Sequence, residues 1–177
     1  MFELLSIVIT GRNQAVYLPE QFRQLRKLNI TTEILYVDRN SIDNSTKIAS
    51  NFTQNIFCVE GDSTYPAAGR WVGTIASEFE WILYIEANQI LTDEFVDFLN
   101  KRTYLGHGDK IAGFVGRYFI SSREELIHEI FFSDKFGGKL DYFDGAVLLK
   151  ADDVRAVGNW NPSIFEYDGI DLISRLS

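Results

Sequence analysis

Residues 4–13 read LLSIVITGRN, a largely apolar and β-branched run that ends in a glycine and two polar residues. A run of this kind over 4–10 is typical of a strand buried on both faces of a parallel sheet. Residues 15–28 then place apolar side chains three or four positions apart, and Pro19 lies early enough for a first helical turn. The opening therefore predicts a strand, a polar loop and a crossover helix.

The same order of strand, loop and helix repeats as far as residue 101. Further strands are predicted at 33–37, 55–59 and 81–85, and further helices at 45–52, 66–77 and 93–101. Alternation at this spacing is typical of right-handed βαβ units in an α/β fold, with a mostly parallel, doubly wound and twisted sheet flanked by helices. Ligands bind such sheets at the carboxyl ends of the strands, so we expect the site there.

Beyond residue 101 the pattern changes. Residues 111–120 and 143–150 are predicted as longer strands with a polar stretch between them that is helical or irregular, and a helix begins at Ala151. The sequence stops at Ser177, directly after an amphipathic stretch at 171–176, and we expect a domain excised from a longer protein. A length of 177 residues fits a single domain.

Composition and charge exclude several classes of protein. Hydrophobic residues make up 46% of the chain and charged residues 24%, which excludes a disordered or fibrous chain. The formal net charge is −8 with no basic run, so no nucleic-acid partner is expected. Cys58 is the only cysteine, which excludes an internal disulfide and fits a reducing, cytoplasmic location. The first apolar run is too short for a membrane helix, so we expect no integral membrane segment.

Several common site motifs are absent from the sequence. No GxGxxG or GxxxxGK[ST] follows the first predicted strand, so the usual dinucleotide and P-loop phosphate sites are not expected. No GxSxG elbow occurs, and His107 and His128 lie outside any nucleophile motif, which argues against a serine or cysteine hydrolase.

Polar residues instead follow three of the predicted strands. They are Thr10 with Arg12 and Asn13, Asp38 with Arg39, Asn40 and Ser41, and Glu86 with Asn88 and Gln89. A carboxylate at a strand end accepts hydrogen bonds from a base or from ribose hydroxyls. The alternative is that Asp38 and Ser41 serve only to start the next helix.

These stretches resemble the family 2 glycosyltransferases. Residues 6–14, SIVITGRNQ, are similar to the family opening SIVIPTYNE, and residues 34–45, ILYVDRNSIDNS, are similar to IIVVDDGSTDGS. Residues 65–91 resemble the family block that holds a conserved arginine and an Asp-x-Asp motif, and residues 145–176 resemble the acceptor-side block. The blocks occur in the family's order and cover essentially the whole chain.

The resemblance implies a GT-A-like fold in one domain, 1–177, with a nucleotide-binding βαβ half at 1–101 and an acceptor-side half at 102–177. It implies transfer of a sugar, with inversion, from a UDP- or GDP-linked donor to an acceptor hydroxyl of a glycan or a lipid-linked acceptor, as in polysaccharide or glycoconjugate biosynthesis. The nucleotide-binding residues that it implies are Thr10, Arg12, Asn13, Asp38, Ser41, Arg70 and Glu86.

The matched positions depart from the family pattern at the metal site. The Asp-x-Asp motif of the family helps to hold Mg²⁺ or Mn²⁺ against the diphosphate, and Glu86 and Asn88 stand at the corresponding positions. Glutamate keeps the charge with a longer reach, whereas asparagine offers only a neutral carbonyl, so we expect a weaker metal site. Arg39 replaces the second Asp of the VDDGS motif, either to contact a phosphate or acidic ligand or as a solvent-facing side chain.

The general base also departs from the family pattern. The alignment places Asp168 on the glutamate and Gly169 on the aspartate of the family's Glu-Asp pair, and glycine cannot take a proton. Asp168 is the first candidate for the base if the loop shifts by one residue, with Glu166 and Asp171 behind it.

Three functions follow from these observations. The first is an inverting glycosyltransferase. The second is a catalytically inactive, glycosyltransferase-like binding or scaffold domain that keeps the fold without transfer. The third is a nucleotidyltransferase-like domain, against which the missing glycine- and lysine-rich loop counts. The polar groups kept at the strand ends favour the enzyme.

Overall fold

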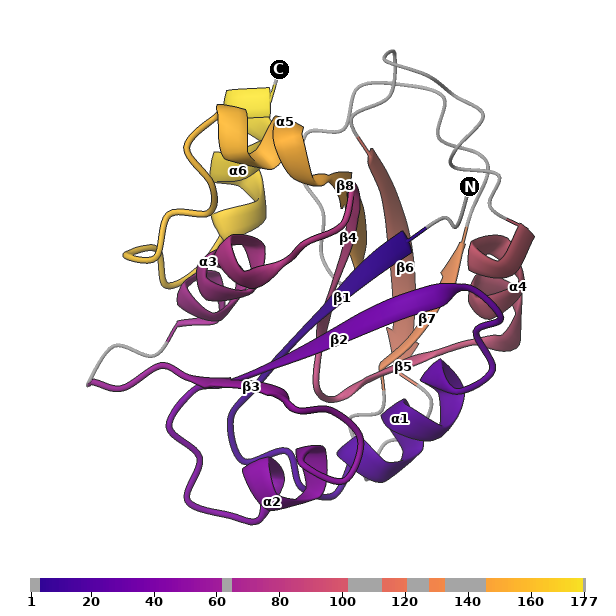
Figure 1. Ribbon diagram of the computed structural model, residues 1–177. Helices are drawn as coiled ribbons and strands as arrows, with labels where there is room; N and C mark the ends of the chain where they lie inside the picture. Colours follow the sequence, from indigo (N-terminus) through magenta and orange to yellow (C-terminus); the bar gives the residue numbers. More distant parts are fainter. Residues whose placement is uncertain (1–3, 62–64, 102–112, 121–127, 133–145, 177) are drawn as a thin grey trace.

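The computed structural model describes residues 4–61, 65–101, 113–120, 128–132 and 146–176. Its elements, in chain order, are β1 (Leu4–Gly11), α1 (Leu18–Leu25), β2 (Thr31–Asp38), α2 (Ser45–Ala49), β3 (Asn55–Cys58), α3 (Pro66–Ala76), β4 (Trp81–Glu86), β5 (Gln89–Leu91), α4 (Asp93–Lys101), β6 (Gly113–Ile120), β7 (His128–Phe132), β8 (Val147–Lys150), α5 (Ala151–Ala156) and α6 (Asp168–Leu176). Figure 1 shows them around one sheet.

The sheet has the strand order β3-β2-β1-β4-β8-β6-β7-β5 (Figure 1). Strands β1 to β4 pair in parallel, β8 is antiparallel to β4, and β6 is antiparallel to both β8 and β7. The chain moves outward from β1 to β3 and then returns to add β4 on the other side of β1. This reversal is a topological switch point, and ligands bind open α/β sheets outside the carboxyl ends of the strands that flank it.

The register sets which side chains meet at the switch point. Thr10 of β1 lies opposite Glu86 of β4, and Gly11 lies opposite Asp38 of β2. Three polar strand ends therefore lie at one edge of the sheet, as the sequence predicted.

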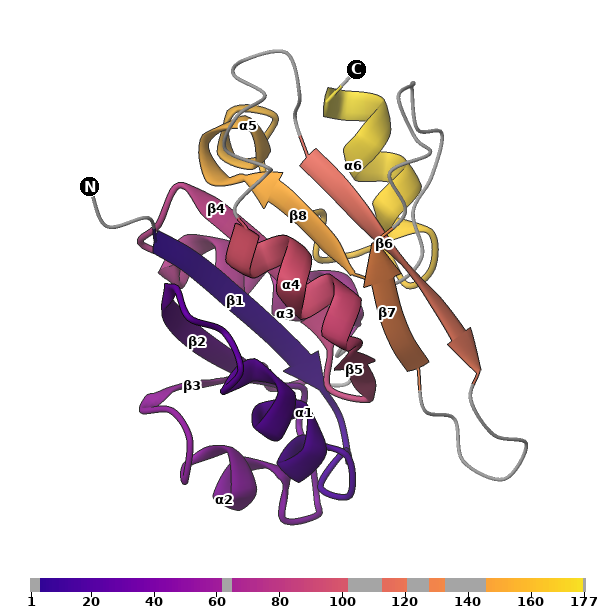
Figure 2. The same ribbon diagram turned by 90° about the vertical axis from the view of Figure 1, so that its right-hand side faces the viewer.

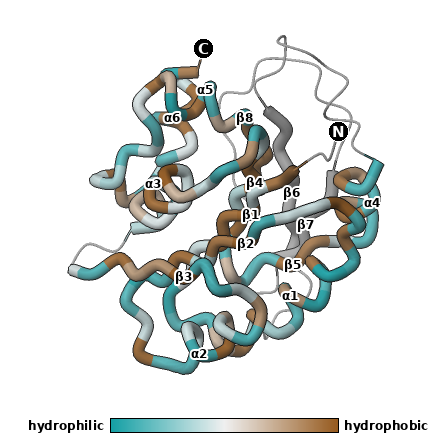
Figure 3. Tube along the Cα trace, in the orientation of Figure 1, coloured by the Kyte–Doolittle hydropathy of each residue, from teal (hydrophilic) through white to brown (hydrophobic). Residues whose placement is uncertain are grey.

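Two apolar cores lie on the two faces of the sheet because successive strand residues point to opposite sides. Ile7 and Leu83 belong to the core under α1 and α4, whereas Val8 and Tyr84 belong to the core that also holds α5 and α6 residues. Figure 2 shows α1 and α4 on one side of the sheet and α5 and α6 on the other. In Figure 3, the apolar stretches of β1 and β4 run through the middle of the molecule.

Helix α3 packs against β1 through two glycines on one helix face. A Cβ atom added at Gly73 would lie 2.3 Å from Cγ1 of Val8, and one added at Gly69 would lie 2.9 Å from Cβ of Thr10. Real Cβ atoms do not approach other atoms so closely, so α3 can pack this near to β1 only because both positions are glycines. The contact carries Arg70 to the carboxyl end of the sheet.

The structure confirms most of the predicted elements and corrects three. The helix predicted at 15–28 is wrong in length, because Gln14 accepts turn hydrogen bonds from Tyr17 and Leu18 and α1 begins only at Leu18. The stretch predicted as helical or irregular between the later strands contains β7, which pairs with β5 and β6. The short strand β5 was not predicted. Residues 143–145 of the last predicted strand, and His107, lie outside the described residues.

No helix in the described part of the chain is long and apolar enough to span a membrane.

Candidate functional site

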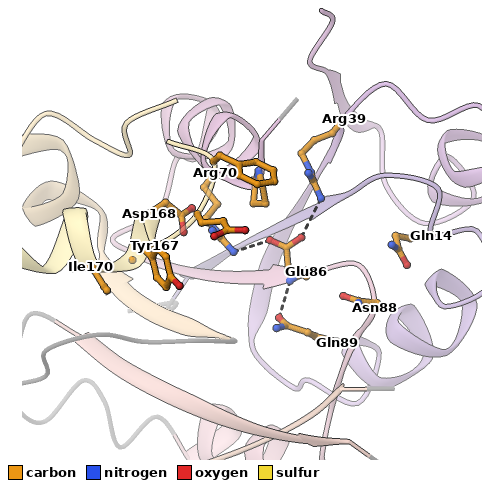
Figure 4. A pocket seen from close by; sticks show the side chains of 13 residues that line it. Gln14, Arg39, Arg70, Glu86, Asn88, Gln89, Tyr167, Asp168 and Ile170 are labelled. Carbon is orange, nitrogen blue, oxygen red and sulfur yellow. Dashed lines mark hydrogen bonds and ion pairs between the residues drawn. The ribbon is translucent and has the colours of Figure 1, made fainter. Parts of the chain in front are cut away.

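A pocket of about 630 Å³ opens at the switch point (Figure 4). Its walls come from Gln14, Arg39, Pro66 and Arg70, from Glu86, Asn88 and Gln89, and from residues 165–170 before and at the start of α6. Volumes of this size are usual for small-molecule sites, which also occur preferentially at switch points. The pocket is therefore the candidate ligand site of the chain.

Glu86 lies at the centre of the charged wall. Its Oε1 accepts a hydrogen bond from Nη2 of Arg70 at 2.7 Å, and its Oε2 lies 3.5 Å from Nη2 of Arg39. Figure 4 shows the two guanidinium groups approaching this carboxylate from different elements. Both carboxylate oxygens thus face a cation.

Arg70 joins two parts of the chain. Its Nη1 also donates to Oδ2 of Asp168, and its Cζ lies 5.0 Å from the centre of the Trp160 ring. The residue is only 9% exposed. Burial opposes its charged form, but the carboxylates of Glu86 and Asp168 outweigh burial and raise the pKa of the guanidinium. Arg70 is therefore a cation held in place by two carboxylates.

Arg39 reaches the pocket because it follows β2 by one residue. Tyr36 and Asp38 point to the α1 face, and the side chain of Arg39 points to the opposite face, beside Gly69 of α3. Burial lowers the pKa of the Arg39 guanidinium, and the positive charges of Arg70 and Arg12 add to this effect while Glu86 opposes it. The interpretation of Arg39 as a solvent-facing side chain is wrong, because its side chain is 14% exposed.

A glutamine pair fixes the end of β4. The Nε2 amide of Gln21 donates to the backbone oxygens of Glu86 at 2.8 Å and of Gln89 at 2.9 Å. Oε1 of Gln89 in turn accepts from the backbone N–H of Glu86 at 2.8 Å. These contacts hold the backbone that carries the Glu86 carboxylate.

The remaining predicted nucleotide residues do not line this pocket. Asp38 is 2% exposed, and its carboxylate accepts hydrogen bonds from the Ser41 N–H and from the Tyr36 hydroxyl. Burial, with the Asp38 charge, raises the pKa of Tyr36, so the phenol stays protonated and donates. These contacts close the loop after β2, and they do not start α2, whose N-cap is Asn44.

The loops after β1 and β2 are joined to each other. The Asn13 N–H donates to Oγ of Ser41 at 2.8 Å, and Oδ1 of Asn13 accepts from the Ile42 N–H at 2.9 Å. Thr10 is fully buried against Gly69, and Arg12 is exposed. Gln14 and Arg39 line the pocket from these two loops, whereas Thr10, Arg12, Asn13 and Ser41 do not.

The segment before α6 forms the opposite wall. Asp168 is the first residue of α6, and Tyr167 before it has a positive φ of 62°. A non-glycine residue in this region is strained, and such strain gathers at functional sites. Phe165 and Tyr167 line the pocket and are 63% and 73% exposed. Figure 4 shows Tyr167 beside Asp168 in this wall.

The donor set does not fit Mg²⁺ or Mn²⁺ at Glu86 and Asn88. In the part of the chain that the structure describes, no group of three or more His, Cys, Asp and Glu side chains is arranged to hold a metal. Hard cations prefer several charged oxygens, but Glu86 is paired with two guanidinium groups and Asn88 is neutral. Like unit charges 4 Å apart repel by about 4 kcal/mol at an effective dielectric constant near 20. Glu86 and Asn88 by themselves therefore do not supply the donor set that the predicted metal role requires.

Sequence analysis named Gln89 among the polar strand ends but missed Gln14, Gln21, Phe165 and Tyr167 as parts of the site or its support. Gln21 carried a usable signal, because it is a polar residue on the apolar face of α1 between Leu18 and Leu25. Phe165 and Tyr167 closely precede Asp168 in the sequence, which is a second signal.

Comparisons with known proteins place the fold. No protein-family profile matches the chain, and no curated protein matches it in sequence. Solved structures do match. Residues 1–349 of S. aureus TarS, also solved with UDP and with UDP-GlcNAc, give a TM-score of 0.73 at 13% identity, over 98% of this chain and 55% of that one. The mannosyltransferase PcManGT from Pyrobaculum calidifontis, in complex with GDP-Man and Mn²⁺, gives a TM-score of 0.71 at 10% identity, over 97% of this chain and 51% of that one.

A third structure is glucosyl-3-phosphoglycerate synthase from Mycobacterium tuberculosis in complex with Mg²⁺ and UDP, with a TM-score of 0.63 at 12% identity, over 97% of this chain and 63% of that one. These neighbours are GT-A-type glycosyltransferases. At such identities the likeness shows the fold, and it confirms the predicted GT-A-like α/β architecture. The chain spans little more than half the length of the first of these structures.

Proposed function

We propose that this chain carries the nucleotide-sugar site of a glycosyltransferase. The enzyme transfers a sugar from a UDP- or GDP-linked donor to an acceptor hydroxyl, with inversion at the anomeric carbon. The observation that supports it most is the pocket at the switch point, where Arg70 links Glu86 to Asp168. The GT-A-like fold of structures solved with UDP, UDP-GlcNAc and GDP-Man supports this choice of donor.

Residues 1–101 form the nucleotide half in this proposal, and 102–177 form the acceptor-side half in the same domain. Arg70 and Glu86 lie at the diphosphate, and Arg12, Asn13 and Ser41 form the nucleoside end, on loops whose shape the buried Thr10 and Asp38 fix. The two loops of that end are already held together by Asn13 and Ser41. A glycan or a lipid-linked molecule is the proposed acceptor, and the cytoplasm is the proposed location, in keeping with the exposed free thiol of Cys58.

The chemistry needs a base and a group that stabilises the leaving diphosphate. A carboxylate oxygen of Asp168 takes the proton of the acceptor hydroxyl, and the oxygen attacks the anomeric carbon as the bond from that carbon to the diphosphate oxygen breaks. The nucleoside diphosphate leaves with the bonding electrons. The guanidinium of Arg70, whose fork of donors matches phosphate oxygens, stabilises the charge that develops on it.

One contact favours a second candidate, a nucleotide-binding domain without transfer. Arg70 holds the carboxylate of Asp168, so the proposed base is occupied in this structure. Transfer requires that bound donor draws Arg70 toward the diphosphate and releases Asp168. A domain in which the pair persists binds nucleotide and transfers nothing.

The test separates binding from turnover. The protein is incubated with UDP-glucose, UDP-GlcNAc and GDP-mannose, with and without an oligosaccharide acceptor, and released UDP or GDP is measured beside calorimetric binding of each nucleotide. Release that depends on acceptor supports the transferase. Binding without release supports the second candidate, and a folded protein that binds neither nucleotide at millimolar concentration overturns both.

A further inference from the structure

Two arginines lie next to Glu86, the residue at the first position of the Asp-x-Asp motif in the family resemblance. Arg39 points its Nη2 at Oε2 of Glu86, 3.5 Å away, while Arg70 holds the other oxygen at 2.7 Å. Both arginines are largely buried, with side chains 14% and 11% exposed. The positive charge next to Glu86 is therefore built from two side chains of the protein.

We propose that the guanidinium groups of Arg39 and Arg70 take the place of the divalent cation, so that the diphosphate of the donor binds here without metal. This inference rests on the proposed function, since it concerns the same site, and it differs from the metal-dependent site that the resemblance implied.

The fold supplies the position of Arg39. Alternation along β2 turns Asp38 to the α1 face and brings Arg39 to the α3 face. Arg39 packs beside Gly69 there: a Cβ atom at Gly69 would lie 3.5 Å from Cδ of Arg39, an ordinary contact, whereas Thr10 at 2.9 Å is what requires the glycine. Arg39 is thus placed between the end of β2 and the first turns of α3.

The chemistry of guanidinium suits the role. Its planar set of N–H donors binds a carboxylate and phosphate oxygens in fixed geometry and keeps its charge at neutral pH. Burial penalises the charged form of Arg39, and the charges of Arg70 and Arg12 add repulsion. A diphosphate relieves both effects, because it brings negative charge to two neighbouring cations. A divalent cation at Glu86 increases the repulsion instead.

Glu86 acquires a different role in this arrangement. Its carboxylate spaces and orients the two guanidinium groups, and the Gln21 and Gln89 amides fix the backbone that carries it. Glu86 is a positioning residue here, not a metal ligand.

The experiment is calorimetric titration of UDP and GDP into the purified chain, once with Mn²⁺ and once with EDTA. We expect dissociation constants for the wild type that agree within about twofold between the two conditions. We expect Arg39→Gln to weaken binding by about tenfold or more in both, since one charge-assisted hydrogen bond is lost, and Arg39→Lys to keep part of the affinity. Arg23→Gln makes the same charge change on the exposed face of α1, where Arg23 pairs with Glu20, and should bind like the wild type.

The double variant Arg39→Asp/Asn88→Asp tests the inference in the opposite direction. It restores acidic residues beside Glu86 and should bind nucleotide more tightly with Mn²⁺ than with EDTA. Circular dichroism checks that each variant is folded, and the Arg39→Gln comparison stands even if the double variant does not fold.

Two results overturn the inference while leaving the proposed function intact. One is wild-type binding that Mn²⁺ strengthens by about tenfold or more, and the other is Arg39→Gln binding with wild-type affinity. A folded wild type that binds neither nucleotide in either condition overturns the inference and the proposed function together.

Discussion

Arg70 in α3 and Asp168 at the start of α6 form an ion pair between residues 98 positions apart in the sequence. The same guanidinium holds Glu86 at the end of β4. One side chain thus connects the end of β4 to the start of α6 at the switch point of the sheet. The stability of the site and its proposed chemistry both depend on this connection.

Arg70→Ala should lower the free energy of unfolding by about 3 kcal/mol, because two carboxylates lose a buried partner. Urea denaturation measures this value. Arg23→Ala removes an arginine from an exposed pair on α1 and should cost less than about 1 kcal/mol. Equal losses in the two variants would contradict a structural role for the Arg70 connection.

Asp168→Asn should abolish transfer and leave nucleotide binding intact. The amide keeps the shape of the side chain but cannot take a proton, so turnover should fall by about 100-fold or more. Nucleotide release and calorimetry measure the two properties separately. Asp171→Asn is the matched control in the same helix, where Asp171 pairs with Arg175. Loss of turnover in Asp171→Asn, with Asp168→Asn active, would assign the base to Asp171.

Gly73→Ala should destabilise the fold by about 2 kcal/mol, since the added Cβ would lie 2.3 Å from Val8 in the α3–β1 contact. Thermal or urea unfolding measures the loss. Val8→Ala in the same chain should recover part of it by removing the clashing methyl groups. Ile75→Ala, at a 60% exposed position of the same helix, should change stability by no more than about 0.5 kcal/mol.

Asp43 should make the stability of the fold depend on pH in the acid range. Burial raises the pKa of its carboxyl, but hydrogen bonds from Ser45 and from the Ala15 N–H outweigh burial and lower it. A group whose folded pKa is lowered stabilises the fold above its unfolded pKa, about 3.9, and loses this contribution as the pH falls through the folded value. The stability difference between wild type and Asp43→Asn should therefore be largest near neutral pH.

Unfolding measured from pH 7 to pH 2 checks this expectation, and the difference should shrink toward zero at the acid end. Ser45→Ala keeps the carboxylate but removes one of its donors, so its acid dependence should be weaker than that of the wild type. A difference between wild type and Asp43→Asn that stays constant over this range would contradict the assignment.

Local patterns predicted the elements well because they depend on neighbours in sequence. The strand β1 and the helix α3 were both predicted from residues that are neighbours in the sequence, and the structure confirms both elements. Strand β7 was not predicted, because its pairing with β5 and β6 depends on the tertiary structure rather than on a pattern in its own residues. Helix α1 is shorter than predicted because a turn at Gln14 takes up the residues before it.

The sequence by itself determined the α/β alternation and the polar residues at the strand ends, since both follow from local order along the chain. Its family resemblance implied the candidates Arg70, Glu86 and Asp168. Only the tertiary structure decided which of them meet. Strand alternation turns Asp38 away from the pocket and Arg39 into it, the glycines of α3 bring Arg70 against the sheet, and α6 returns Asp168 to that arginine. These contacts join residues far apart in sequence, and their geometry depends on register and packing, which no local spacing contains.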